Sequence, residues 1–96
     1  MNLPQAKPEQ VLPMHPVESS QIAKLGHDPR TNTLAIQFKN WKGQPTSIYW
    51  YGNVTAEEYL ALKNAPSIGK HFGENIKPNP KKYPYRKVQN SPEEFA

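Results

Sequence analysis

The sequence contains no cysteine, and this absence removes several classes of chemistry. Without thiols the chain cannot form disulfides, zinc sites with thiolate ligands or cysteine nucleophiles. No apolar run approaches the roughly 18–20 residues that a membrane-spanning helix needs. Residues 1–8, MNLPQAKP, also lack the apolar segment of a secretory signal peptide. We therefore expect a soluble, cytoplasmic protein without membrane contact.

Histidine is scarce as well, since His15, His27 and His71 are the only three. None of them forms a pair with metal-ligand spacing, and the chain has no carboxylate cluster. His27 and Asp28 are neighbours in sequence, which does not make a catalytic dyad, and Ser67 is explained as a helix cap. We predict no catalytic residue, no metal site and no cofactor, and hence a protein that is not an enzyme.

The 96 residues have a net charge of +4, and the positive charge is concentrated late in the chain. Residues 77–87 contain several basic side chains, two tyrosines and no acidic residue. Such a segment is typical of a nucleic-acid contact, and also of an ordinary solvated terminus. Its cations are Lys77, Lys81, Lys82, Arg86 and Lys87.

The chain is long enough for one domain, with less regular segments at both ends. Residues 1–16 are rich in proline and poor in large apolar side chains, which predicts a flexible, disordered proline-rich arm. The domain is expected over residues 17–88, and residues 89–96 are expected to fray.

Three strands are predicted inside this domain. Apolar and other side chains alternate imperfectly in residues 20–27 and clearly in residues 34–38. The third strand, residues 48–51, is rich in aromatic and β-branched side chains. The two connections are short, so the strands should form an antiparallel meander. The second connection, residues 40–47, is a hairpin loop with an exposed or rim Trp41.

The third strand is apolar on both of its faces. Tyr49 and Tyr51 share one face, while Ile48 and Trp50 take the other. Either the second face is covered like the first, or one aromatic set is exposed for binding.

Two short helices are predicted after the strands. Thr55 and Glu58 have the spacing of a capping box, and Pro66 ends the helix that they begin. Ser67 can cap a second helix that continues to about residue 74. The predicted fold is therefore α+β: a three-stranded antiparallel meander, then two short helices.

The order of these features resembles the KTSC domain, a small module named for its occurrence at the C-terminus of some lysyl-tRNA synthetases. The module also occurs as a free-standing protein in bacteria and phages. The resemblance covers about residues 17–88 and departs from the family at His27 and in a longer loop at 40–47. It rests on Ser19-Ser20 with Ile22, Gly26, Asp28, Leu34-x-Ile36-x-Phe38, Tyr49-x-Tyr51, Val54, Tyr59, Leu62, Ala65-Pro66-Ser67-x-Gly69-x-x-Phe72, Ile76 and Tyr83-Pro84-Tyr85.

RNA binding has been suggested for the family from the synthetase context, so the resemblance implies a non-catalytic RNA or single-stranded nucleic-acid binding module. Small sheets bind single strands by stacking bases on aromatic rings beside cations. Tyr49 and Tyr51 are interpreted mainly as core residues, which leaves the two tryptophans as contacts. The predicted nucleic-acid-binding residues are Trp50, Trp41, Lys39, Lys42, Lys77, Lys81, Lys82, Arg86 and Lys87.

A protein partner is the alternative. In this interpretation the chain is an interaction module or an accessory factor of phage or mobile-element origin. It would use the proline-rich arm and an exposed aromatic patch.

Overall fold

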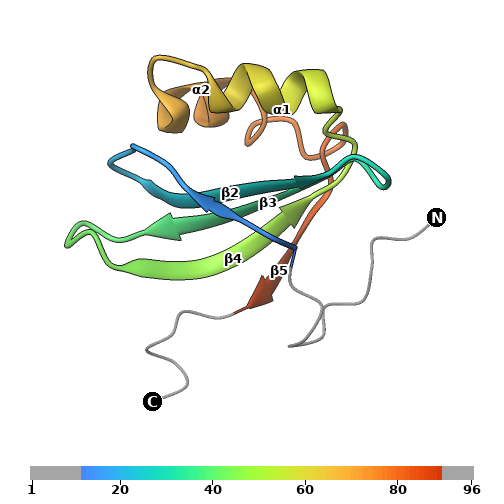
Figure 1. The fold of residues 1–96 in the computed structure, drawn as a ribbon. Helices are drawn as coiled ribbons and strands as arrows, with labels where there is room; N and C mark the ends of the chain where they lie inside the picture. Colours follow the sequence, from blue (N-terminus) through green and yellow to red (C-terminus); the bar gives the residue numbers. More distant parts are fainter. Residues whose placement is uncertain (1–11, 90–96) are drawn as a thin grey trace.

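The computed structural model describes residues 12–89, which form one antiparallel sheet with two helices on one side of it (Figure 1). The five strands lie in chain order, β1-β2-β3-β4-β5. The α+β class is confirmed, but the expected meander of three strands is wrong because the sheet has a further strand at each edge. The elements are β1 His15–Pro16, β2 Ile22–Asp28, β3 Thr33–Lys39, β4 Pro45–Tyr51, α1 Ala56–Lys63, α2 Ile68–Asn75 and β5 Tyr85–Gln89.

Both helices begin at the capping residues that the sequence indicates. The Thr55 side chain accepts from the Glu58 amide, and the Glu58 carboxylate accepts from the Thr55 amide, so the capping box is complete. The Ser67 side chain accepts from the Lys70 amide at the start of α2.

The main core lies between the helices and the sheet. Alternation places Leu34 and Ile36 of β3 on this side, where they meet Leu62 of α1 and Phe72 of α2. The remaining buried members of this core are Ile22, Leu25, Tyr51, Val54, Ile68, Ile76 and Tyr83.

The opposite face of the sheet holds a smaller core around Trp50, which packs with Ala35 and Ile48. Leu12 and Met14 pack against this cluster from the N-terminal side. Trp50 is consequently 1% exposed. Its predicted role as a nucleic-acid contact is therefore wrong in this fold, because a buried indole presents no face on which a base can stack.

Residues 12–16 belong to the folded domain, although the sequence analysis placed them in the flexible arm. His15 and Pro16 pair with Leu25 and Lys24 of β2. Residues 1–11 of the predicted arm, and residues 90–96 of the predicted frayed tail, lie outside the described part of the chain. The ordered domain thus begins earlier than the expected boundary at residue 17.

Gly26 permits the N-terminal segment to lie this close to the sheet. A Cβ atom at Gly26 would come within 2.0 Å of the Pro13 carbonyl oxygen and 3.0 Å of the Met14 side chain. Its partner on β3 is the small residue Ala35. Two small side chains side by side leave the space into which the Pro13 backbone fits.

Strand β5, like β1, was not predicted as part of the sheet. It pairs antiparallel with β4, with Tyr85 opposite Tyr51 and Lys87 opposite Tyr49. Its pairing with β4 spans a connection that contains both helices.

The two glycines Gly26 and Gly73 provide a matched test of the N-terminal cover. Gly26→Ala should lower the free energy of unfolding by about 1–3 kcal/mol, because the new methyl group meets backbone that cannot yield cheaply. It should also shift the Trp50 fluorescence to the red as Leu12 and Met14 move away. Urea unfolding followed by tryptophan emission measures both effects.

The control is Gly73→Ala in α2, where an added Cβ meets nothing within 4 Å. Alanine has a higher helix propensity than glycine, so this variant should gain up to about 1 kcal/mol. Equal stability of Gly26→Ala and the wild type would contradict the close packing of Pro13.

Candidate nucleic-acid interface

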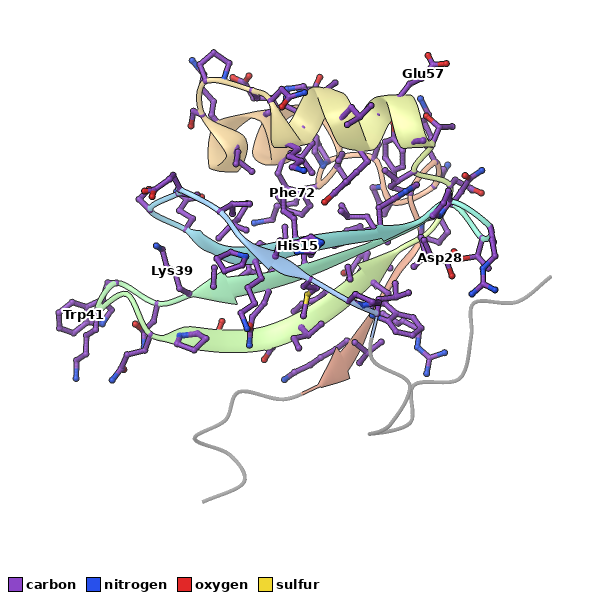
Figure 2. All side chains as sticks on the ribbon, viewed as in Figure 1. His15, Asp28, Lys39, Trp41, Glu57 and Phe72 are labelled. Atoms are coloured by element: carbon purple, nitrogen blue, oxygen red, sulfur yellow. The ribbon has the colours of Figure 1, made fainter. Side chains whose placement is uncertain are left out.

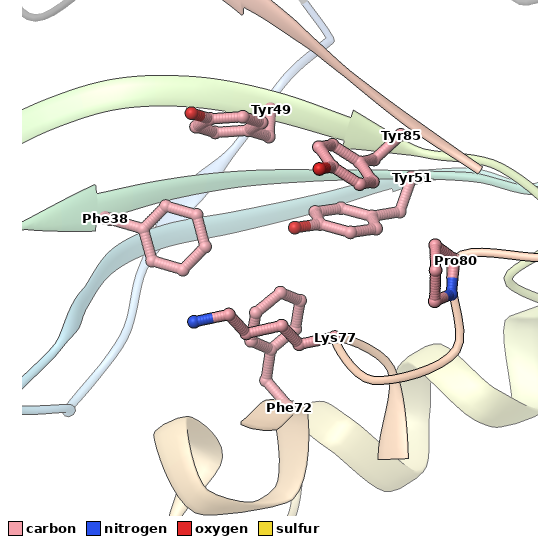
Figure 3. Close-up of a pocket in the computed structure, with 7 residues that line it drawn as sticks. All are labelled: Phe38, Tyr49, Tyr51, Phe72, Lys77, Pro80 and Tyr85. Carbon is pink, nitrogen blue, oxygen red and sulfur yellow. The ribbon is translucent and has the colours of Figure 1, made fainter. Parts of the chain in front are cut away.

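An aromatic cleft of about 420 Å³ opens on the helix-bearing side of the sheet (Figure 3). Strands β3, β4 and β5 form one wall, and α2 with the chain that follows it forms the other. We call it the aromatic cleft; its lining residues are Phe38, Tyr49, Tyr51, Phe72, Lys77, Pro80 and Tyr85.

The three tyrosines of the cleft lie side by side on the two last strands. Tyr85 stacks on Tyr51 with 5.3 Å between the ring centroids and lies 6.1 Å from the ring of Tyr49. These positions follow from the strand register, which pairs Tyr85 with Tyr51 across the sheet. The result is a broad aromatic surface built on paired backbone.

The far end of this surface is anchored in the core. Tyr51 and Phe72 are buried, and their rings meet edge to face at 5.2 Å. Phe38 extends the same packing to both Phe72 and Tyr49. The interpretation of Tyr49 and Tyr51 as core residues is thus confirmed for Tyr51, whereas Tyr49 is only partly buried.

The hydroxyl group of Tyr51 stays protonated at neutral pH. Burial, and then the neighbouring hydroxyls of Tyr85 and Tyr49, raise the pKa of Tyr51 to about 12. The cleft therefore contains a hydrogen-bond donor and no negative charge from this residue.

Two cations belong to the cleft side of the sheet. Lys77 lines the cleft directly, and its backbone amide donates to the Phe72 carbonyl at the end of α2. Figure 3 shows its side chain extending from the segment after α2 among the residues that line the cleft. Lys87 lies on the same sheet face as Tyr85, two positions along β5, and pairs with Tyr49. The aromatic surface is thus accompanied by positive charge.

The wall that contains Lys77 and Pro80 is fastened to the rest of the domain by Glu58. The hydroxyl of Tyr83 donates to the Glu58 carboxylate, and the ammonium group of Lys82 lies 3.4 Å from it. The amide of Gly52 donates to the Pro84 carbonyl at 2.7 Å. These contacts hold the connection from α2 to β5 against α1 and the end of β4.

The other predicted contact residues are distributed over several surfaces. Lys39 and Trp41 lie at the β3–β4 hairpin, at one end of the sheet (Figure 2), and Lys42 follows Trp41 in the same hairpin. Lys81 is exposed on the connection after α2, whereas Lys82 is engaged by Glu58. Arg86 pairs with Trp50, and its position in β5 puts it on the opposite face from Lys87.

Of the seven residues that line the cleft, sequence reasoning named only Lys77 as a site residue. The six that it did not name as site residues are Phe38, Tyr49, Tyr51, Phe72, Pro80 and Tyr85. The signal for two of them was present. Phe38 is the last residue of the alternating strand, and Tyr85 follows the helices in an aromatic, proline-containing segment. What was missing was the knowledge that β5 returns to β4.

His27 has a structural role in this fold. Its Nε2 lies 2.6 Å from the Val54 carbonyl oxygen, and its ring stacks on Tyr59 at 5.0 Å. Within residues 12–89 there is no group of three or more histidine, aspartate or glutamate side chains placed to hold a metal ion.

A family model of the KTSC domain matches residues 18–83. The chain belongs to the KTSC domain family. The match contains six of the seven residues that line the aromatic cleft and ends before Tyr85. The resemblance noted in the sequence is thereby confirmed.

Two known proteins are similar to this chain at about one third identity. An uncharacterized protein of Stutzerimonas stutzeri strain A1501 is 33% identical over 67 residues, which cover 70% of this chain and 87% of that protein. The crystal structure of a KTSC domain protein from Yersinia pestis matches with a TM-score of 0.67 at 32% identity. That match covers 81% of this chain and 99% of the Yersinia chain.

Helices α1 and α2 of the KTSC domain are both too short and too polar to cross a bilayer, and the described residues contain no other helix that is suited to it.

The Glu58 contact makes the stability of the domain depend on pH. Hydrogen bonds from the Thr55 amide and from Tyr83 are the main causes that lower the pKa of Glu58 from 4.5 to about 2. The folded state therefore binds fewer protons than the unfolded state between these values. The stabilisation from this carboxylate is complete above pH 4.5 and is lost as the pH falls towards 2.

Urea unfolding at a series of pH values tests this assignment. The free energy of unfolding of the wild type should fall more steeply between pH 4.5 and about 2 than that of Glu58→Gln, which has no proton to take up in this range. Glu57→Gln changes the exposed neighbour and should follow the wild type. Parallel curves for all three proteins would contradict the role of Glu58.

Proposed function

We propose that this KTSC domain is a non-catalytic module that binds single-stranded nucleic acid in the aromatic cleft, with RNA as the favoured ligand. The supporting observation is that a cation, Lys77, lines a cleft of tyrosine rings beside the open edge of β5. Bases would stack on Tyr49 and Tyr85, and the phosphates would lie near Lys77 and Lys87.

The shape of the cleft favours an unpaired strand. A base must present its flat face to stack on a tyrosine ring, and bases within a duplex are already stacked on each other. Tyr85 is 56% exposed, so its ring is accessible without a rearrangement of the fold. Stacking on aromatic side chains is tolerant of sequence because every base has such a face. We therefore propose that the cleft prefers single strands and does not select a particular nucleotide sequence.

The charge in the cleft argues against a cationic ligand. Cages of tyrosine and other aromatic rings also bind quaternary ammonium groups through cation–π attraction. Here the ammonium group of Lys77 lies in the same cleft and would repel such a ligand. A nucleotide joins a planar ring to an anionic phosphate, and so matches both the tyrosine rings and the ammonium group of Lys77.

The cations differ in how much they can contribute to binding. Lys77 and Lys87 lie on the cleft side, whereas the Lys82 ammonium group is 3.4 Å from the Glu58 carboxylate and so partly neutralised. Arg86 lies on the other face. We therefore rank Lys77 and Lys87 above Lys82 and Arg86 as phosphate contacts.

Binding of a fluorescently labelled decauridylate, measured by anisotropy at several salt concentrations, tests the proposal. Tyr85→Ala should weaken binding by about 1–3 kcal/mol, the usual contribution of one stacked base. Lys77→Met should weaken binding at low salt and reduce the slope of log K against log salt by about 0.7, as expected for one lost phosphate contact.

Lys63→Met is the matched control, because Lys63 is an exposed lysine of α1 that does not line the cleft. It should bind like the wild type apart from a small general loss of charge. No binding by the wild type at low salt, or unchanged binding by both cleft variants, would refute the proposal. Capture of a protein partner that is insensitive to salt would support the interaction-module alternative instead.

A further inference from the structure

Trp41, at the tip of the β3–β4 hairpin, is the most exposed large hydrophobic residue of the described chain, at 89%. Figure 2 shows it at the far end of the hairpin, away from both cores. It makes no contribution to either core cluster. Its indole face is therefore available to a partner. Packing within the fold does not explain this exposure.

The turn that presents Trp41 is ordered by Asn40. The Asn40 side-chain oxygen accepts from the amides of Lys42 and Gln44 at 2.9 and 3.0 Å, and its side-chain amide donates to the Gln44 side chain. The amide of Gly43, which has a φ of 81°, donates to the Asn40 carbonyl at 2.9 Å. A residue on such a preformed turn loses less conformational freedom on binding than one on an unconstrained loop.

Positive charge lies close to the indole. The Lys42 ammonium group lies 5.2 Å from the centre of the Trp41 ring, within the range of cation–π attraction. Lys39 ends β3 at the base of the same hairpin. Glutamate and aspartate are absent from residues 39–44. An aromatic face beside one cation, with a second cation at the base of the hairpin, has the same chemistry as the aromatic cleft, a ring for a base and charges for phosphates.

The hairpin continues the strands that line the cleft. Phe38, at one end of the cleft, is three residues from Trp41, so their Cα atoms are at most about 11 Å apart. Stacked nucleotides advance about 3.4 Å each along one strand. About three nucleotides would therefore reach from the end of the cleft to the indole.

We infer that Trp41, with Lys39 and Lys42, is a second stacking platform, and that one single strand binds the cleft and the hairpin together. This inference rests on the proposed function and adds a length requirement to it. A dinucleotide would occupy the cleft alone, while a strand of about five or more nucleotides would reach both platforms.

The test compares diuridylate with decauridylate in binding to the full chain. Trp41→Ala should weaken decauridylate binding about tenfold, the equivalent of one lost stacked base, and leave diuridylate binding within about twofold. Trp41→Phe keeps an aromatic face and should restore most of the loss. Leu60→Ala removes another exposed apolar side chain, on α1, and should change neither affinity.

The emission of the wild type provides a readout that needs no variant. Trp50 is buried, so quenching of long-wavelength tryptophan emission reports on Trp41. Decauridylate should quench this emission and diuridylate should not.

The inference and the proposed function can fail separately. If Trp41→Ala binds decauridylate like the wild type while Tyr85→Ala binds it weakly, the second platform is refuted and the cleft stands. If Trp41→Ala weakens diuridylate and decauridylate equally, the length requirement is refuted. If the wild type binds neither oligonucleotide at low salt, the proposed function fails, and the inference fails with it.

Discussion

The sheet of this protein is apolar on both faces, and each face has to be removed from water by a different part of the chain. Helices α1 and α2 cover the side of Leu34, Ile36 and Tyr51. Leu12 and Met14 cover part of the side of Trp50. Burial of apolar surface is the main favourable contribution to folding, so a domain of this size depends on both covers. The cleft exists because the first cover leaves the aromatic surface of β4 and β5 partly open.

The local features of the fold are readable from the sequence because they rest on short-range chemistry. The Thr55 capping box, the Ser67 cap and the alternation around Ile36 each involve residues within a few positions of one another. All three appear in the structure as expected, and the boundaries of the three predicted strands differ from the observed ones by a few residues.

The edges of the sheet are less predictable because their formation depends on distant residues. Strand β1 is two residues long and includes a proline, so it has no pattern of its own. Strand β5 is an edge strand with exposed polar side chains at Arg86 and Lys87, and it lacks the apolar alternation that identifies a half-buried strand. The positions of Trp50 and Tyr85 followed from these two edges. The burial of Trp50 and the exposure of Tyr85 were therefore inaccessible to reasoning from residues 48–51 alone.

The aromatic cleft is built by combining a rigid wall with a charged one. Paired strands fix the tyrosine rings, and the hydrogen bonds around Glu58 fix the segment from which Lys77 extends. A ligand that binds between two such walls meets groups already in place, so little of the interaction energy is spent on ordering them.

The pairing of β5 with β4 has a kinetic consequence. Strands β2, β3 and β4 are joined by short turns and can pair locally, whereas β5 must return across a connection that contains both helices. Contacts between residues far apart in sequence form slowly because the intervening loop has to be closed first. The last strand to join the sheet is thus the one that brings Tyr85 and Lys87 to the cleft. An incompletely folded chain would possess a meander and helices but no cleft, so a nascent or misfolded copy would lack the surface through which we propose that the finished protein binds.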